Sequence, residues 1–217
     1  MRAMHREARG GGITQVRGGI LLAVLVVACA AAPAQAEWVV TPYLGINLAG
    51  DVEFRRGGPG GSAGYFGGRL GFEFDFERYN HFFKDEDVAH LVPNNCGVGP
   101  AGEPCTDLNT DAMSFMGNVV VPLHSRGAKS WRPYAAAGLG VIHAWFDAPG
   151  DQYDTDQTNL ASNVGGGVMY SLNDRVRLRG DARYFRAFVD EKEREGGYFK
   201  DYGFLRLTVG VTFTFGR

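Results

Sequence analysis

The chain has 217 residues and carries 22 basic against 24 acidic side chains, which gives a formal net charge of −2. A length of this order suits one domain of ordinary size. The near balance of charge argues against a nucleic-acid partner, because no basic patch stands clear of matching acidic residues.

The first 36 residues have the three parts of a secretory signal peptide. A segment with four arginines comes first, an apolar run follows over residues 20–32, and Ala34-Gln35-Ala36 offers small residues for cleavage. The apolar run is shorter than the roughly 20 residues that a membrane-spanning helix needs. We therefore predict a leader over 1–36 and a mature domain over 37–217. A retained N-terminal anchor is the alternative.

The mature part begins with segments in which apolar and polar side chains alternate, the period-two pattern of β-strands. The first strand covers residues 37–48, and a Gly-rich loop over 50–61 separates it from a weaker strand at 62–66. Gly67-Gly68 suits a tight hairpin turn, because glycine accepts positive φ. A clear strand follows at 69–77. Its polar face carries Arg69, Glu73, Asp75 and Glu77.

An irregular stretch over residues 84–108 contains Cys96 and Cys105, the only cysteines that remain after cleavage of the leader. In an exported protein, a close pair of cysteines in one loop is most simply a disulfide. A metal site would need more ligands, and His90 is the only histidine nearby. We therefore predict a Cys96–Cys105 disulfide.

Three further strands are predicted at 111–123, 131–146 and 158–172, where the same alternation returns. The acidic loop 147–157 separates the last two. Its four aspartates could share a calcium ion, but the spacing lacks the glycine and the terminal glutamate of an EF-hand. A solvated acidic loop is the preferred interpretation.

Two long alternating strands close the chain, at 175–188 and 199–215, with the charged segment 190–197 between them. One face of each strand is largely apolar. Most charges lie on the other face, and that polar face carries Arg177, Arg179, Asp181, Arg183 and Arg206. A lipid-facing apolar side and a polar interior are typical of a transmembrane barrel.

Outside the leader, no apolar run approaches the length of a membrane helix, so any crossing must be made by strands in a closed barrel. Eight strands with alternating long and short connections predict an all-β, eight-stranded, antiparallel transmembrane barrel. Trp131 and Trp145 are 14 residues apart. At ~3.3 Å per residue and ~40° tilt they lie roughly 35 Å apart along the membrane normal, at the two interfacial belts. The predicted belt residues are Trp38, Trp131, Trp145, Tyr184, Phe213 and Phe215.

The predicted lumen collects charges of both signs. An eight-stranded lumen is only wide enough to be filled by side chains, and a buried charge without a partner is strongly destabilising. We expect a plug in which carboxylates of the 69–77 strand pair with arginines of the 175–188 strand. A gated ion path is the alternative. The predicted network comprises Arg69, Glu73, Asp75, Glu77, Arg177, Arg179, Asp181, Arg183 and Arg206.

Four stretches, 64–73, 132–140, 163–168 and 178–186, resemble the small eight-stranded outer-membrane β-barrel proteins, the OmpA/OmpX-like group. The likeness covers essentially the whole mature chain. It implies a place in the outer membrane of a Gram-negative cell, with membrane lipid and the barrel-assembly machinery as partners. It also implies extracellular loops that present a surface for a ligand. Such barrels usually end on an aromatic residue, whereas Gly216 and Arg217 follow Phe215 here.

The resemblance favours a structural or surface-interaction role in the outer membrane. A small porin-like channel is the first alternative, and a lipid-modifying outer-membrane enzyme or a soluble lipocalin-like binder are others. The histidines are scattered and no motif joins them to a nucleophile, so we expect no enzymatic activity. Gly138-Leu139-Gly140 lies inside a strand with no helix after it, so it is no nucleotide loop, and we expect no cofactor or metal.

Overall fold

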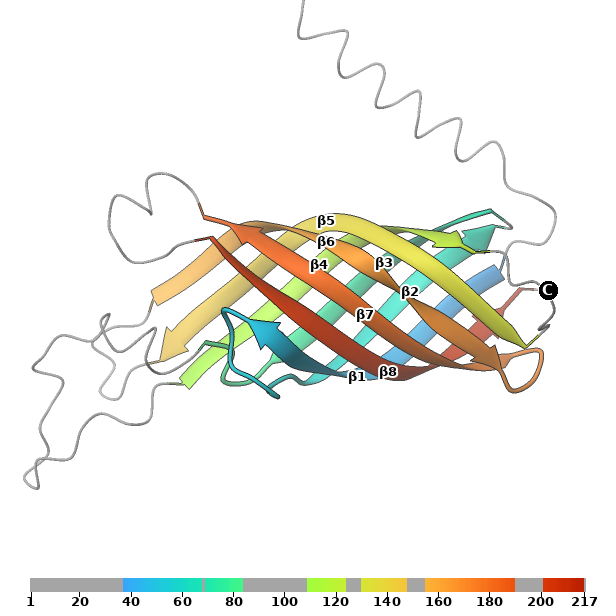
Figure 1. Ribbon diagram of the computed structural model, residues 1–217, viewed down its shortest axis with the longest axis horizontal. Coiled ribbons are helices and arrows are strands. Elements are labelled where there is room, and N and C mark those ends of the chain that lie inside the picture. The colour runs from blue at the N-terminus through green and yellow to red at the C-terminus, as the bar shows by residue number, and fades with distance from the viewer. Residues whose placement is uncertain are drawn as a thin grey trace, which may run out of the picture. The chain divides into compact units, whose positions relative to one another are not determined.

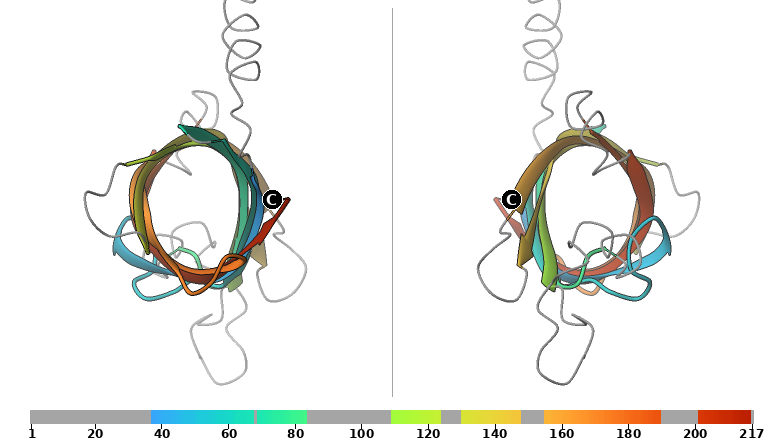
Figure 2. Two further views of the ribbon diagram at one scale, coloured as in Figure 1. Left: turned by 90° about the vertical axis from the view of Figure 1, so that its right-hand side faces the viewer. Right: turned by 90° about the vertical axis from the view of Figure 1, so that its left-hand side faces the viewer.

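The computed structural model describes residues 37–67, 69–83, 109–123, 130–147, 155–189 and 201–216, which form eight strands. Their bounds are β1 Glu37–Gly50, β2 Pro59–Gly67, β3 Leu70–Tyr79, β4 Asn109–Pro122, β5 Trp131–Asp147, β6 Thr155–Ser171, β7 Val176–Phe188 and β8 Tyr202–Phe215. Each strand pairs with the next, and β8 pairs with β1, so the sheet closes into a barrel (Figures 1 and 2). The predicted eight-stranded antiparallel barrel is confirmed.

The β1–β8 seam runs along the whole length of both strands. Trp38 lies opposite Phe215 at one end and Gly50 opposite Phe204 at the other, with one shift in register between Asn47 and Ala49. A closed barrel leaves no strand edge with unpaired backbone groups. Among the described residues, no helix is long and apolar enough to cross a membrane.

The two ends of the barrel differ in the length of their connections (Figure 1). At one end, which we call the turn end, β6 and β7 are joined by a short turn. Asn173 stabilises this turn, because its Oδ1 accepts hydrogen bonds from the backbone N–H groups of Arg175, at 2.9 Å, and Val176, at 2.8 Å. At the opposite end, the loop end, the connections include the long segments 80–108 and 189–201.

β2 begins earlier than its sequence pattern predicts. Pro59, Gly60 and Gly61 already pair with β1, although the sequence places them in a loop. Glycine carries no side chain to show alternation, so this part of the strand is invisible to a pattern of apolar and polar residues. Gly60 also has a packing role, because a Cβ there would lie 2.5 Å from Cε2 of Tyr43.

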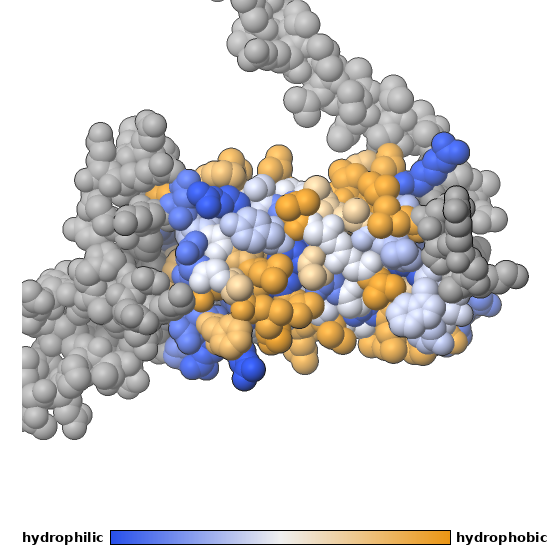
Figure 3. Space-filling view, viewed as in Figure 1, coloured by the Kyte–Doolittle hydropathy of each residue, from blue (hydrophilic) through white to orange (hydrophobic). Residues whose placement is uncertain are grey.

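The barrel is apolar outside and polar inside, the reverse of a soluble protein. Large apolar side chains are exposed on the outer face, among them Leu44 and Val209, each 69% exposed, and Phe74, 76% exposed. Figure 3 shows hydrophobic residues over the middle of the barrel and hydrophilic residues near the end where the loops begin. This arrangement suits a lipid-facing surface and argues against the lipocalin-like alternative.

The facing of the strands can be tested with arginine substitutions at two depths. Val209→Arg, in the middle of β8, should destabilise the barrel in lipid by about 2–4 kcal/mol, because it places a charge near the bilayer midplane. Leu172→Arg, in the β6–β7 turn, should cost only about 0–1 kcal/mol, because it lies near the interface. Urea titrations in lipid vesicles would measure the free energy of unfolding of both variants. Equal decreases in that free energy would contradict the assigned depths.

Candidate functional site

The lumen is the candidate site, because it gathers the buried charges of the barrel in one layer and packs apolar side chains beside them in a second. One layer consists of ion pairs, and within it Arg183 and Arg206 are each only 1% exposed. The second layer, nearer the loop end, is a cluster of aromatic and aliphatic side chains. Both layers are built by strands whose alternate residues point inward.

The first group of ion pairs joins two arginines of β7 to two carboxylates. Glu73 of β3 accepts hydrogen bonds from Arg179 and, at 2.9 Å, from Nη2 of Arg183. Asp181 pairs with the same two arginines, at 2.7 Å from Nε of Arg183 and 3.3 Å from Nη2 of Arg179. The Ser62 hydroxyl donates to Oε2 of Glu73 at 3.2 Å. The four charges therefore neutralise one another in a compact, water-poor group.

The second group is centred on Arg206 of β8. Its Nη1 lies 3.0 Å from Oδ1 of Asp75 and 2.8 Å from Oε2 of Glu77. The Tyr43 hydroxyl donates to Oδ2 of Asp75 at 2.9 Å. The guanidinium of Arg206 also stacks 4.6 Å from the centre of the Phe185 ring. Gly45 provides room here, because a Cβ at that position would lie 2.7 Å from Cδ of Glu77.

A third pair lies nearer the turn end. Arg177 binds Glu37 with both terminal nitrogens, at 2.6 and 2.9 Å, and Arg132 approaches the same carboxylate at 3.6 Å. Glu37 was not among the residues that the sequence pattern assigned to the lumen. The signal was present, because Glu37, Val39 and Thr41 share one face of β1 and all point inward.

Seven of the nine predicted lumen charges meet in the first two groups of ion pairs, whereas Arg177 pairs separately with Glu37 and Arg69 stays outside the lumen. Arg69 precedes Leu70, the first residue of β3, and is exposed, because the inward-outward alternation ends where the strand ends. The pairing also differs from the expectation. Glu73 alone joins β3 to the arginines of β7, whereas Asp75 and Glu77 pair with Arg206 of β8.

Buried tyrosines complete the network, and sequence reasoning gave them no role. The Tyr134 hydroxyl accepts a hydrogen bond from Nε of Arg179 at 2.7 Å and donates one to Asp181. The Arg179 guanidinium lies 4.9 Å from the centre of the same ring. Tyr134 could have been found from its place on the inward face of β5, among apolar residues.

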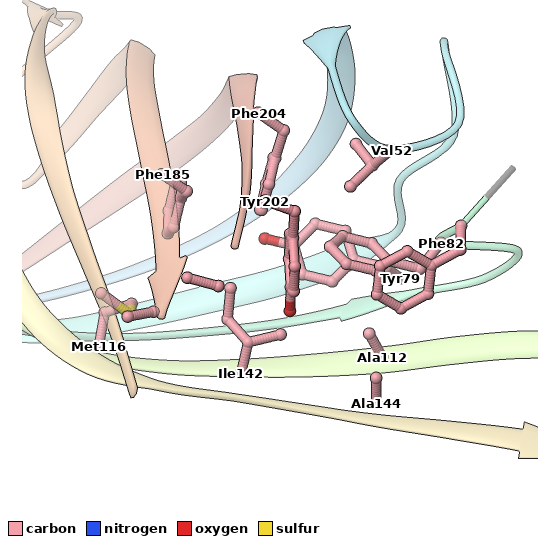
Figure 4. Packing of buried hydrophobic residues seen from close by; sticks show 13 residues of the cluster. Val52, Tyr79, Phe82, Ala112, Met116, Ile142, Ala144, Phe185, Tyr202 and Phe204 are labelled. Carbon is pink, nitrogen blue, oxygen red and sulfur yellow. The ribbon is translucent and has the colours of Figure 1, made fainter. Parts of the chain in front are cut away.

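The apolar layer fills the lumen at the loop end (Figure 4). The Phe82 ring lies 5.3 Å from that of Phe204, and Phe204 stacks on Phe185 at 5.0 Å. The cluster as a whole contains Val52, Tyr79, Phe82, Phe83, Ala112, Met116, Ile142, Ala144, Ala161, Phe185, Ala187, Tyr202 and Phe204. The layer also contains buried polar groups, because the Tyr79 hydroxyl lies 3.4 Å from Nη1 of Arg206 and 3.3 Å from the hydroxyl of Ser114.

Two segments outside the strands close this end, and we call them the lid: residues 51–54 and 80–83. The backbone N–H of Asp51 donates to the carbonyl of Gly203 at 2.9 Å, and the N–H of Glu53 donates to the carbonyl of Phe82 at 2.9 Å. The lid thereby directs Val52, 1% exposed, and Phe82, fully buried, into the barrel mouth (Figure 4).

The ion pairs leave little space between them. A cavity of about 10 Å³ lies among the ion pairs, lined by hydroxyl groups and by charged side chains that include Arg183 and Arg206. That volume admits roughly one water molecule. It is far too small for an aqueous channel, and the interpretation as a plug is therefore favoured over the ion path.

The predicted belt residues lie on the outer face of the barrel. Trp38 and Phe215 are opposite each other at the turn end and are exposed by 62% and 55%. Trp131 packs on Tyr170 at 4.8 Å at the same end. The remaining three, Phe213, Tyr184 and Trp145, also point outward, with Trp145 near the loop end of β5.

Other candidate sites are absent from the described residues or lie outside them. Cys96 and Cys105 fall outside the described ranges, as does most of the acidic loop 147–157. Within those ranges, no group of three or more His, Cys, Asp or Glu side chains could hold a metal ion. His143 Nδ1 lies 2.7 Å from the Thr158 hydroxyl, but no carboxylate of a described residue is hydrogen-bonded to His143.

A family model described as "Outer membrane protein beta-barrel domain" matches residues 20–215. No curated protein matches the chain. A major outer membrane protein from Thermus thermophilus is 16% identical, with a TM-score of 0.56, over 83% of this chain and 100% of that one.

Two further solved structures resemble the chain. Neisserial surface protein A is 18% identical, over 83% of this chain and 96% of its own, with a TM-score of 0.49. The N-terminal barrel of Pseudomonas aeruginosa OprF is 17% identical, over 83% of this chain and 100% of its own, with a TM-score of 0.48. At these identities the likenesses concern the fold alone.

The ion-pair layer yields a stability prediction. Glu73→Gln keeps the volume of the side chain but removes the charge that Arg179 and Arg183 share, so it should destabilise the barrel by about 3–5 kcal/mol. Arg78→Gln is the matched control. It breaks the exposed pair with Asp111 and should cost about 0–1 kcal/mol. Similar unfolding free energies for the two variants would show that the buried pairs contribute little.

The lid yields a second prediction. Phe82→Ala should cost about 3–5 kcal/mol, because it removes a fully buried ring that contacts several others. Phe54→Ala, in the same pair of lid segments but 53% exposed, should change stability by less than about 0.5 kcal/mol. Urea unfolding in lipid would measure the free energy of unfolding of both variants. A small decrease for Phe82→Ala would show that the lid does not contribute to the stability of the core.

Proposed function

Because the chain belongs to the outer membrane protein β-barrel domain family, we propose that it is a closed outer-membrane anchor that presents its loop-end connections as an extracellular interaction surface. One observation carries the proposal: ion pairs fill the middle of the lumen and the lid fills its loop end. A barrel without a passage exposes only its outer wall to lipid and its loops to the surroundings.

The orientation follows from the connections. In outer-membrane barrels the long loops are extracellular and the short turns periplasmic. The loop end, with the segments 80–108 and 189–201, is therefore the extracellular end. Both the start of β1 and the end of β8 lie at the periplasmic end. A disulfide between Cys96 and Cys105 would cross-link the longest of these loops, and this pairing stays a prediction.

The partners follow from the same placement. The outer wall contacts membrane lipid, and the strand β8, which carries Phe213 and Phe215 near its end, is the segment that the barrel-assembly machinery would read. The loops would bind a ligand outside the cell. We propose no catalytic role for the chain, because it belongs to a family of outer-membrane barrels and its buried polar groups form a plug.

Electrical recording tests whether the barrel is closed. The full mature chain in planar bilayers should give no steady, large single-channel currents, because the lid and the ion pairs block the lumen. A variant with Val52→Ala and Phe82→Ala should show a higher frequency of small current events, since it opens the extracellular seal. Sustained large currents from the unmutated protein would establish the channel alternative instead.

Binding assays test the role of the loops. Replacing residues 84–108 by a short Gly-Ser linker should abolish binding to an extracellular ligand that the full barrel captures, while leaving the barrel folded. Heat-dependent gel mobility would check folding, and surface plasmon resonance with arrays of glycans and matrix proteins would measure binding. Equal binding by the shortened barrel would place the interaction surface elsewhere.

A further inference from the structure

The extracellular end of the barrel carries an exposed aromatic-cationic segment that neither the plug nor the loop hypothesis uses. We call Phe54, Arg55 and Arg56 the tip. Phe54 is the last residue of the first lid segment, and the two arginines follow it. Phe54 is 53% exposed and both arginines are exposed. The guanidinium of Arg55 lies 5.1 Å from the centre of the Phe54 ring, within the range of a cation–π contact.

The tip is held in place by its backbone. The N–H of Arg55 donates to the carbonyl of Asn47 at 2.8 Å, and the carbonyl of Arg56 accepts from the N–H of Asn47 at 2.7 Å. Arg55 has a φ of 60°, in the left-handed region that non-glycine residues seldom adopt. Such a conformation persists only where the surrounding structure maintains it. The tip therefore presents its side chains from a fixed backbone.

The tip lies beside the lipid-facing wall and not above the mouth. In both end views of Figure 2 the cyan segment after β1 extends outside the ring of strands. Arg56 is hydrogen-bonded to Asn47, the residue that follows Ile46 in β1. Ile46 is exposed on the apolar outer face of the barrel. This position corresponds to the upper edge of the apolar surface, where lipid headgroups begin.

The arginines of the tip differ from other outward-facing arginines near the same end in having no carboxylate partner among the described residues. Arg78 pairs with Asp111 at 2.9 Å, and Arg186 pairs with Asp201 at 3.5 Å. Among the described residues, Arg55 and Arg56 have no carboxylate partner. A guanidinium binds phosphate with two parallel hydrogen bonds, and aromatic rings settle at the membrane interface. Together these groups have the chemistry to bind an anionic headgroup.

We propose that Phe54, Arg55 and Arg56 form a binding site for the phosphate of an anionic lipid in the outer leaflet. The ring enters the interface beside the apolar wall, and the two guanidinium groups bind the phosphate above it. The site rests on the membrane placement of the barrel and is independent of any ligand of the loops. Its failure would therefore leave the loop hypothesis standing.

The test uses the full mature chain in nanodiscs made of equal parts phosphatidylglycerol and phosphatidylcholine with the same acyl chains. Native mass spectrometry counts the lipids retained after release. The variant with Arg55→Gln and Arg56→Gln should retain less phosphatidylglycerol, by about fivefold for each arginine removed, with phosphatidylcholine unchanged. Phe54→Ala should reduce the retention of both lipids, because the ring contributes interfacial contact and no charge.

The matched control removes two exposed arginines from the opposite end, Arg69→Gln with Arg175→Gln. This variant should keep the retention of the unmutated protein, although its net charge is the same as that of the tip variant. Equal retention by the tip variant and the unmutated protein would overturn the site. An equal loss in the control would overturn it too, because net charge would then explain the binding. Displacement of phosphatidylglycerol by an equal concentration of inorganic phosphate would overturn the assignment to lipid. Gel mobility before and after heating confirms that each variant is folded.

Discussion

Five carboxylates and four arginines are buried among the described residues of the lumen, where water screens them poorly, so each depends on a partner of opposite charge. For all of them except Asp181, that partner comes from another strand. This requirement fixes the register of the barrel. A slip of one residue in β7 would turn Arg179 and Arg183 toward lipid and bring Leu178 into the lumen. The same slip would leave Glu73 without a counter-charge. The ion pairs thus specify which residues face inward as firmly as the apolar wall specifies which face outward.

The lumen divides into a polar layer and an apolar layer along the barrel axis. In the middle of the lumen, charges of opposite sign fill the interior and neutralise one another. At the loop end, the lid brings Val52 and Phe82 from outside the strands into the cluster that contains Phe185 and Phe204. Its backbone hydrogen bonds connect the β1–β2 segment to β8 and to the segment after β3. The mouth is therefore closed by connections that the sheet itself positions.

Alternation alone was enough to predict the strands, their facing and most members of the charge network. It succeeded in β3, β7 and β8, where charged and apolar residues alternate over many positions. It failed at Gly60, which has no side chain to reveal a strand, and at Phe82 and Phe83, whose segment is too short to show a period. It also assigned Arg69 to the lumen, although β3 begins only at Leu70. The pairing of Arg206 with Asp75 and Glu77 depends on the stagger of the closed barrel, which no local pattern records.

The ion pairs also constrain the route by which the barrel forms. Arg177 and Glu37 are 140 positions apart in the chain, and Arg206 and Glu77 are 129 apart. These partners meet only when β1 and β8 close the seam. A partly inserted sheet would expose unneutralised charges to the bilayer, at a cost of several kcal/mol each. Insertion into the bilayer and closure of the barrel are consequently coupled, because these charges are neutralised only once the seam has formed.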